Sequence, residues 1–253
     1  MERSFSNMQE KIRLCHLYPD LLNLYGDRGN ILALVRRASL RGIDLEVEAV
    51  SIGENFDPDR YDMIFVGGGQ DAEQNILRSD FVSVKGEKIK EAIEKNKVFL
   101  CICGGYQMMG HYYEEHDGHK IECLGAVDIW TVGKKSRFIG DTVYSCDLLP
   151  ESKILYGFEN HSGRTYLGEG VKPLAKVLTG SGNNGEDGTE GAIYKNVYCT
   201  YSHGSFLPKN PEMTDYLLKT ALEVQKGTPF TLSSLATDVE DYARNALPTC
   251  IKP

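Results

Sequence analysis

The sequence predicts an α/β fold in a single domain, with a mostly parallel central sheet flanked by helices and antiparallel strands added in the second half. Two observations predict it. As far as residue 110, apolar runs typical of strands alternate with amphipathic segments typical of helices. Beyond residue 110, short strand-like runs are separated by turns that contain Gly, Asn or Pro. Alternating strands and helices build parallel sheets covered on both faces, whereas strands joined by short turns pair antiparallel.

The first half is expected to fold as strand, helix, strand, strand, helix and strand. Its first helix carries Ile31, Leu34 and Ala38 on one face. Gly42 is suited to end that helix, because glycine readily adopts the left-handed conformation of a C-cap. The expected strands are 12–18, 44–51, 62–66 and 98–102, and the expected helices are 31–42 and 82–96.

The second half shows no linker and no repeat that would divide the chain. Residues 180–188, rich in glycine and asparagine, are expected to form an exposed, mobile loop. We therefore predict one domain over 12–227, preceded by a loosely held segment at 1–11 and followed by a helical extension at 228–253. The expected strands are 120–131, 136–147, 154–167, 174–178 and 192–201, and the expected helices are 212–226 and 235–247.

Composition limits the classes of function. The chain has 253 residues, of which 41% are hydrophobic, and a formal net charge of −8. Because an acidic chain repels phosphate groups, nucleic-acid binding is not expected. No apolar run reaches the roughly 18 residues of a membrane span, and residues 1–11 lack an apolar signal core. Seven cysteines in no paired spacing indicate a reducing, cytoplasmic location, and none of them completes a zinc-binding pattern.

Residues 98–110 are the most informative stretch, because a buried strand is expected to enter a tight turn and then a helix. Cys103 occupies that turn, followed by Gly104 and Gly105. A cysteine placed there stands above the positive end of a helix, which favours a nucleophilic thiolate. The pattern matches the nucleophile elbow of α/β hydrolases, with cysteine in place of serine. The structural alternative is a core cysteine, which suits Cys101 better than Cys103 because a core cysteine requires no following glycines.

A second glycine-rich turn, residues 67–72, ends the third predicted strand. It formally fits a dinucleotide-binding pattern, but that pattern belongs to the first strand-to-helix turn, and the chain has no Gly-Lys-Ser/Thr ending of a P-loop. A glycine loop at a strand's carboxyl end can instead aim backbone N–H groups at an oxyanion. Since neighbouring ends of parallel strands form one crevice, we expect residues 67–69 and Cys103 to share a site, with a plain turn as the alternative.

The candidate base lies in residues 194–207, where a strand leads into Ser202, His203 and Gly204. A histidine at a strand end beside glycine is well placed to serve a cysteine, and the two residues need only meet in space. His161 is the rival base. For either histidine, a structural role is the alternative interpretation.

Taken together, these stretches resemble the class I glutamine amidotransferases of the cobyric-acid-synthase type, and the resemblance covers nearly all of residues 12–227. Within that family the chain is most similar to the stand-alone glutaminase subunits of lipid II isoglutaminyl synthases, because residues 17–30 and 203–211 are typical of that group. The fold implied is that of the class I amidotransferases. The family signatures are residues 65–71, 103–107, 157–161 and 201–204.

The resemblance implies a hydrolase of the glutamine amide. Cys103 would attack the side-chain carboxamide, His203 would take the thiol proton and return one to the leaving ammonia, and water would release glutamate from the thioester. Backbone N–H groups near Gly69 and Gly104 would hold the tetrahedral oxyanion. Arg137 matches the family position that anchors the substrate glutamine, and a guanidinium suits its α-carboxylate. Judged from its lysine-rich surroundings alone, Arg137 is better interpreted as an exposed arginine.

Two positions depart from the family pattern. Many class I amidotransferases have glycine two residues before the nucleophile, where this chain has Cys101. Many also have a glutamate two residues after the histidine, where this chain has Ser205. No local acid therefore stands behind His203, and either the Cys–His pair works as a dyad or an acid elsewhere in the chain orients the histidine.

The resemblance also implies a partner, because ammonia released into bulk water at neutral pH is mostly protonated. The expected partner is a Mur-ligase-like, ATP-dependent subunit that forms a heterodimer and amidates the D-glutamate of lipid II to D-isoglutamine in peptidoglycan synthesis. ATP and Mg are expected on the partner, lipid II is reached through it, and no cofactor or metal is expected on this chain. The alternatives are a glutaminase for cobyrinic acid amidation in cobalamin synthesis and a non-catalytic regulatory subunit.

Overall fold

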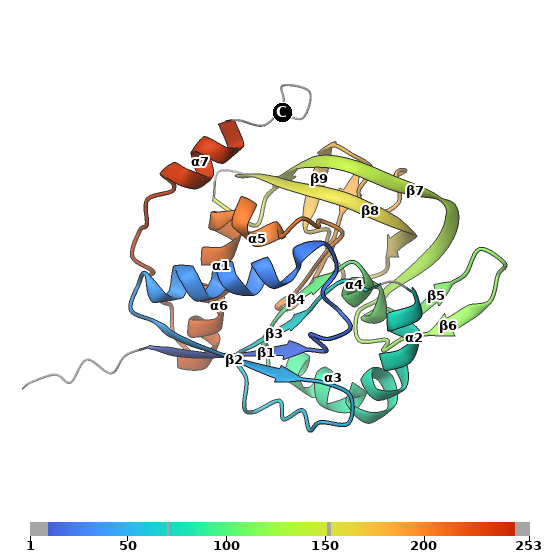
Figure 1. Ribbon diagram of the computed structural model, residues 1–253, viewed down its shortest axis with the longest axis horizontal. Helices are drawn as coiled ribbons and strands as arrows, with labels where there is room; N and C mark the ends of the chain where they lie inside the picture. The colour runs from blue at the N-terminus through green and yellow to red at the C-terminus, as the bar shows by residue number, and fades with distance from the viewer. Residues whose placement is uncertain (1–9, 70, 151–152, 246–253) are drawn as a thin grey trace, which may run out of the picture.

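The computed structural model describes residues 10–69, 71–150 and 153–245 and confirms the predicted α/β class (Figure 1). The central sheet is built from β1 Lys11–Leu17, β2 Asp44–Val50, β3 Met63–Val66, β4 Val98–Ile102, β11 Ala192–Tyr194 and β12 Val197–Thr200. Its strand order is β11-β12-β4-β3-β1-β2, and all neighbours are parallel except β11 and β12. The mostly parallel central sheet is therefore as predicted.

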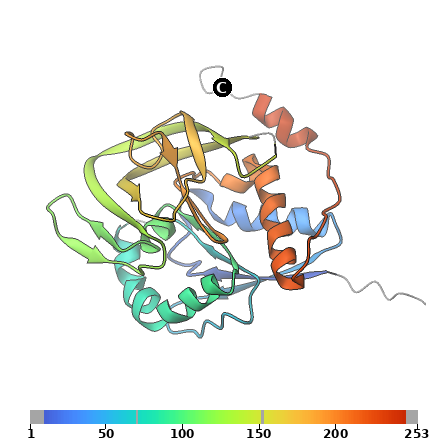
Figure 2. The same ribbon diagram turned by 180° about the vertical axis from the view of Figure 1, so that it is seen from behind.

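Helices cover both faces of this sheet. The helices of the described residues are α1 Arg28–Ser39, α2 Asp71–Ser79, α3 Gly86–Glu94, α4 Gly104–Met108, α5 Phe206–Lys209, α6 Pro211–Lys226 and α7 Asp238–Asn245. The helices α1 and α6, which lie side by side in Figure 2, cover one face, and α2 and α3 cover the other. Because successive side chains of a strand point to opposite faces, β4 contributes Phe99 and Cys101 to one core and Leu100 and Ile102 to the other.

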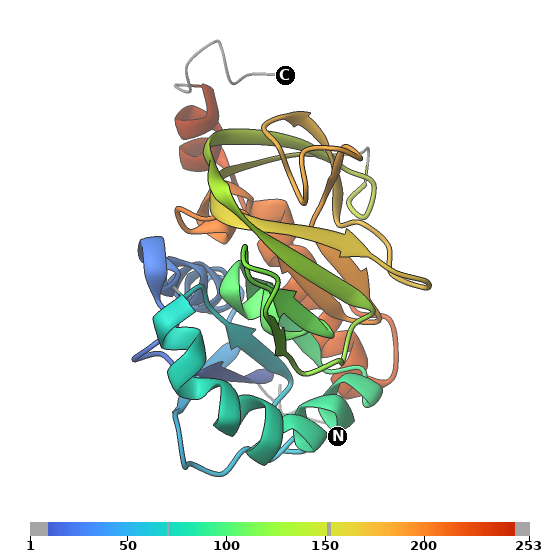
Figure 3. The ribbon, with the colours of Figure 1, turned by 90° about the vertical axis from the view of Figure 1, so that its right-hand side faces the viewer.

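Most strands of the second half form a sheet of their own. They are β5 Tyr112–Glu114, β6 Lys120–Glu122, β7 Ile129–Cys146, β8 Lys153–Leu167, β9 Ala175–Thr179 and β10 Thr189–Glu190. This sheet is antiparallel except where β5 pairs parallel with β7. The order is β10-β9-β7-β5-β6, with β8 paired to β7, and Figure 3 shows β7 and β8 as a long twisted ribbon. The register between β7 and β8 shifts between Gly133 and Phe138, so part of β7 bulges out of the ladder.

The loop at 180–188 is exposed only in part: Gly180 and residues 185–188 are exposed, as its composition predicts, but residues 182–184 are buried. Asn183 and Asn184 are buried, and the side chain of Asn183 both donates to and accepts from the backbone of Gly191, at 2.9 and 2.8 Å. Two backbone N–H groups of the loop donate to the buried carboxylate of Glu159. The polar residues here satisfy internal hydrogen bonds, so a polar composition is a poor guide to exposure in this loop.

Other elements differ from the prediction in extent. The helix α2 is additional, and the helix expected at 82–96 is divided into a π-helical turn at Asp80–Val84 and α3. The expected segments 1–11 and 228–253 lie partly outside the described residues; within them, β1 begins at Lys11 and α7 ends at Asn245. None of the helices in the described part of the chain is long and apolar enough to cross a membrane.

The carboxyl ends of the parallel strands define where a ligand can bind. The helix α1 joins β1 to β2 across one face, whereas α2 and α3 join β3 to β4 across the other. The winding of the chain therefore reverses between β1 and β3, and α/β proteins bind ligands in the crevice at such a point. The loops that follow β1, β3, β4 and β12 all open toward this edge, because these four strands are parallel.

Candidate active site

Cys103 follows β4 directly and stands in a strained turn. Its φ of 47° and ψ of −99° are unfavourable for a residue with a side chain, and α4 begins at the next residue. The turn is held on both sides, since the Cys103 N–H donates to the Thr200 carbonyl and the Cys103 carbonyl accepts from the Gln107 N–H, each at 2.9 Å. The half-buried side chain lines a cavity. This strand, turn and helix match the nucleophile elbow that residues 98–110 predict.

The two glycines after Cys103 are required by the space around them. A Cβ on Gly104 would lie 2.9 Å from the carbonyl oxygen and 3.0 Å from the amide nitrogen of Gly69. A Cβ on Gly105 would lie 2.6 Å from the carbonyl oxygen of Val66. The start of α4 therefore packs directly on the end of β3. Gly69 lines the cavity, whereas Gly104 is buried at the first position of α4 and is not among the lining residues.

His203 reaches the same cavity from the end of β12. Its side chain is 0% exposed, and its backbone N–H donates to the Phe158 carbonyl of β8 at 2.7 Å. Burial lowers the pKa of the imidazole, but the charge of the Cys103 thiolate and the side-chain interactions with Asp27 and Cys103 outweigh burial and raise the pKa of His203 to about 10. His203 is therefore positively charged at neutral pH and can stabilise a thiolate on Cys103.

The structure places an acid beside His203 that the sequence did not assign. Asp27, in the loop after β1, is 0% exposed, and its Oδ1 lies 3.9 Å from Nδ1 of His203. The other carboxylate oxygen accepts a hydrogen bond from the Gly68 N–H at 2.5 Å. No motif spacing connects the two residues. The signal in the sequence was the position of Asp27 in a turn-rich loop that follows a strand of the parallel sheet.

The glycine loop after β3 crosses directly over the Cys–His pair. A Cβ on Gly68 would lie 2.8 Å from Cε1 of His203, 3.2 Å from Oδ2 of Asp27 and 3.6 Å from Cβ of Cys103. The Gly68 carbonyl also accepts a hydrogen bond from the Leu24 N–H at 3.2 Å, so the loop after β1 holds Gly68 on both sides. The prediction that residues 67–69 and Cys103 share one site therefore agrees with the geometry.

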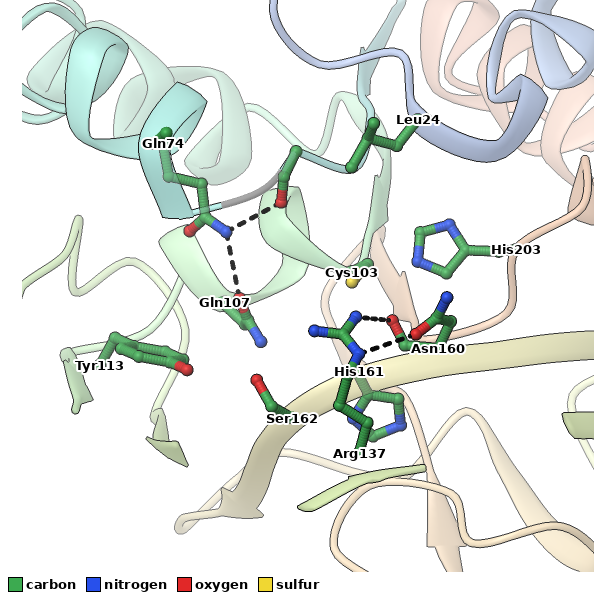
Figure 4. A pocket seen from close by; sticks show the side chains of 12 residues that line it. Leu24, Gln74, Cys103, Gln107, Tyr113, Arg137, Asn160, His161, Ser162 and His203 are labelled. Atoms are coloured by element: carbon green, nitrogen blue, oxygen red, sulfur yellow. Dashed lines mark hydrogen bonds between the residues drawn. The ribbon is translucent and has the colours of Figure 1, made fainter. Parts of the chain in front are cut away.

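Arg137 enters the cavity from the bulge in β7 (Figure 4). Its Nε donates to the side-chain oxygen of Asn160 at 2.9 Å and its Nη2 donates to the Asn160 carbonyl at 3.0 Å. Arg137 is exposed and lines the same cavity as Cys103 and Gly69. A bulge redirects a side chain out of the alternation of its strand, which is why the pattern of β7 alone could not place Arg137.

His161 also lines the cavity, but it is poorly suited to be the base. Its Nδ1 donates to the Gly163 carbonyl at 2.8 Å, and its ring stacks on Tyr201 with 3.6 Å between centroids. Burial lowers the pKa of His161 to about 3, so the ring is neutral at physiological pH. The arrangement therefore favours His203 over its rival.

Two glutamines complete the wall behind the glycine loop. Gln74 Nε2 donates to the Gly69 carbonyl at 3.1 Å and to Oε1 of Gln107 at 3.3 Å, and Gln107 in turn donates to the Tyr201 hydroxyl at 3.2 Å (Figure 4). These bonds fix the direction of the Gly69 carbonyl. Gln74 was not predicted from the sequence, and Gln107 was included only as part of the family signature at residues 103–107.

The cavity has a volume of about 350 Å³, which suits a small polar ligand such as an amino acid. A thiol paired with a charged imidazole can be acylated by an amide, and an exposed guanidinium can bind a carboxylate. Within residues 10–69, 71–150 and 153–245, no three His, Cys, Asp or Glu side chains gather as metal ligands would.

Residues 13–211 match the CobB/CobQ-like glutamine amidotransferase domain. The chain is 43% identical over 222 residues to the lipid II isoglutaminyl synthase (glutamine-hydrolyzing) subunit GatD of Streptococcus pneumoniae, covering 87% of this chain and 84% of that one. It is 43% identical over 237 residues to the GatD subunit of Staphylococcus aureus, covering 94% and 95% of the two chains.

Among solved structures, a chain of PurLQS from Thermotoga maritima superposes with a TM-score of 0.61 at 16% identity, over 85% of this chain and 99% of that chain. At this identity the superposition supports the fold alone. The two relatives each cover most of the chain, and the family match over residues 13–211 includes every candidate site residue described above. This protein therefore belongs to the CobB/CobQ-like glutamine amidotransferase family.

Proposed function

We propose that this chain hydrolyses the side-chain amide of glutamine by thioester chemistry at Cys103 and passes the ammonia to an ATP-dependent ligase subunit. The observation that carries the proposal is the pairing of Cys103 with a charged, fully buried His203 in a cavity of about 350 Å³. Membership of the glutamine amidotransferase family supplies the substrate. Neither finding alone distinguishes a glutaminase from another cysteine hydrolase, but together they favour glutamine.

In the proposed reaction, the Cys103 thiolate attacks the amide carbon of glutamine and the carbonyl oxygen becomes an oxyanion. The oxyanion is held by backbone N–H groups at Gly69 and Gly104. The imidazolium of His203 donates its proton to the amide nitrogen, the carbon–nitrogen bond breaks, and ammonia leaves. Neutral His203 then takes a proton from water, and the resulting hydroxide cleaves the thioester to release glutamate and regenerate the thiolate and imidazolium.

The first prediction concerns Arg137, which we assign to the α-carboxylate of glutamine. In the Arg137→Ala variant, KM for glutamine is expected to rise by about 10- to 100-fold with kcat little changed, because a charge-assisted hydrogen bond contributes about 1.5–3 kcal/mol to binding. Lys134→Ala is the matched control, since Lys134 is an exposed cation in the same part of β7 that does not line the cavity. An equal change of KM in both variants would remove the assignment.

A glutamine-like diazo-ketone provides the test of the nucleophile without requiring the partner. We expect mass spectrometry to find the label on Cys103 at least about 10²-fold ahead of Cys15 and Cys146, because only a thiol beside an imidazolium is held as a thiolate. Burial raises the pKa of the Cys15 and Cys146 thiols, which keeps them unreactive. Excess glutamine should protect Cys103. Label spread evenly over the three thiols would favour a non-catalytic, regulatory subunit.

We further propose that the ammonia serves amidation of lipid II. Both 43%-identical relatives are named as subunits of lipid II isoglutaminyl synthase, and each match covers more than four-fifths of both chains. The partner would be a Mur-ligase-like subunit that binds ATP and Mg, activates the D-glutamate carboxylate of lipid II in the cytoplasm, and forms a heterodimer with this chain. Co-purified with that ligase, the chain should produce amidated lipid II with glutamine as nitrogen donor; activity on a corrinoid acid instead would redirect the assignment.

A further inference from the structure

We propose that Asp27 is the acid that positions and charges His203, in place of the glutamate that the family commonly has two residues after its histidine. The inference rests on the proposed function, because it assigns a further residue to the same glutaminase site. Because Ser205 carries no carboxylate, Asp27 would supply the acceptor group behind the imidazole. Three features of Asp27 support this role: its burial, its contacts and the charges around His203.

The Asp27 carboxylate does not serve the helix that it precedes. Asp27 occupies the N-cap of α1, where an aspartate usually accepts a backbone N–H of the first helical turn. Its side chain makes no capping hydrogen bond and turns instead into the interior, where it is 0% exposed. A carboxylate buried in this way is unfavourable unless a cation or several donors face it, so its surroundings decide whether it is retained.

The two carboxylate oxygens of Asp27 contact different parts of the site, the glycine loop and the imidazole of His203. One oxygen accepts the Gly68 N–H at 2.5 Å, and Gly68 lies directly over His203 and Cys103. The other lies 3.9 Å from Nδ1 of His203, an ion-pair contact that is longer than a hydrogen bond. Asp27 therefore connects the imidazole to the glycine loop.

The charged groups around His203 leave the stabilisation of its protonated ring to Asp27. On β1, His16 faces Asp27, but burial lowers the pKa of His16 to about 4, so it is neutral at physiological pH. On β8, His161 is neutral for the same reason. The groups whose charges raise the pKa of the His203 ring are Cys103 and Asp27, and Asp27 is the carboxylate of the two.

The test replaces the carboxylate by an amide of the same shape. In Asp27→Asn the amide oxygen can still accept the Gly68 N–H, but the negative charge beside His203 is lost. Because an anion stabilises the protonated ring, its removal lowers the pKa of His203, and the alkaline limb of kcat/KM for glutamate release moves to lower pH. We expect kcat to fall by about 10²-fold with KM for glutamine little changed.

Nuclear magnetic resonance of ring-labelled histidines follows the same proton without requiring activity. The His203 signal, assigned with His203→Gln, should titrate at lower pH in Asp27→Asn than in the wild-type chain. Asp20→Asn is the matched control, because Asp20 is an exposed carboxylate in the same loop. Its titration curve and pH profile should match the wild type. An unshifted His203 titration in a folded Asp27→Asn variant would overturn the inference.

A second variant keeps the inference testable if Asp27→Asn does not fold. In Cys103→Ser the thiolate charge is absent, and burial alone would hold the pKa of His203 below its ordinary value of 6.5. A His203 titration that stays above 6.5 in this variant therefore requires Asp27, and one below 6.5 contradicts its role. If the wild-type chain released no glutamate with its ligase, the proposed function would fail while both titrations still decided the role of Asp27.

Discussion

Replacing Cys103 by alanine is expected to abolish glutamate release while leaving the fold intact. Without the sulfur no thioester forms, and removal of a catalytic nucleophile typically lowers kcat by about 10⁴-fold or more. The backbone of the elbow should persist, since alanine loses only the sulfur and the turn is held by hydrogen bonds to Thr200 and Gln107. The measurement is glutamate formed per chain over time, in the presence of the ligase subunit.

The control for this prediction is Cys123→Ala. Cys123 is also a free, half-buried cysteine, but it does not line the cavity. Its replacement should leave glutamate release within about twofold of the wild type, because a surface-proximal change of this size typically alters stability by less than about 1 kcal/mol. Both variants should also retain their binding to the ligase. Glutamate release at the wild-type rate by Cys103→Ala would remove the nucleophile assignment.

Adding a single methyl group at Gly68 is expected to lower activity strongly, although by less than the loss of the Cys103 sulfur. The new Cβ would lie 2.8 Å from Cε1 of His203, closer than real Cβ contacts allow. Because His203 is 0% exposed, its ring cannot swing into solvent to make room. Either the ring or the glycine loop must move, and a displacement of about 1 Å in a catalytic group lowers rates by about 10²-fold. We expect kcat/KM of Gly68→Ala to fall by at least that factor.

Gly140→Ala is the matched control for that substitution. A Cβ on Gly140, in β7, would meet no atom within 4 Å, and the backbone there is not left-handed. The same chemical change should therefore leave kcat/KM near the wild-type value. Circular dichroism and thermal melts would establish that both variants are folded. Equal activity of the two variants would show that the glycine loop does not lie against His203 as described.

The local parts of the site were predictable because short stretches of sequence encode them. An apolar run followed by Cys103 and two glycines predicts a strand, a tight turn and a helix, and the structure has all three. Likewise, the glycines at 67–69 predict a loop at a strand's carboxyl end, and they form one beside Cys103. The forces involved act between near neighbours in the chain, so the pattern of residue types is sufficient.

The resemblance to a family, and not the strand pattern, predicted His203 and Arg137 as partners of Cys103, because strand pairing between distant segments leaves no periodic signal. The strand β12 lies beside β4, which brings His203 to Cys103, and it was predicted only as a strand of the second half. Arg137 reaches the cavity through a register shift in β7. The exposed loop at 180–188 was predicted only in part, since residues 182–184 are buried and the Asn183 side chain serves hydrogen bonds with Gly191 rather than solvent.

By itself, then, the sequence determined the α/β class, the elbow at Cys103 and the resemblance to a glutaminase, all of which are written in contiguous residues. Only the tertiary structure decided which groups face the sulfur. It placed Asp27 behind His203 and the Gly68 amide between them, from loops that follow different strands. The physical reason is that packing two faces of one parallel sheet brings the carboxyl ends of its strands together, and no sequence spacing records which side chains then meet.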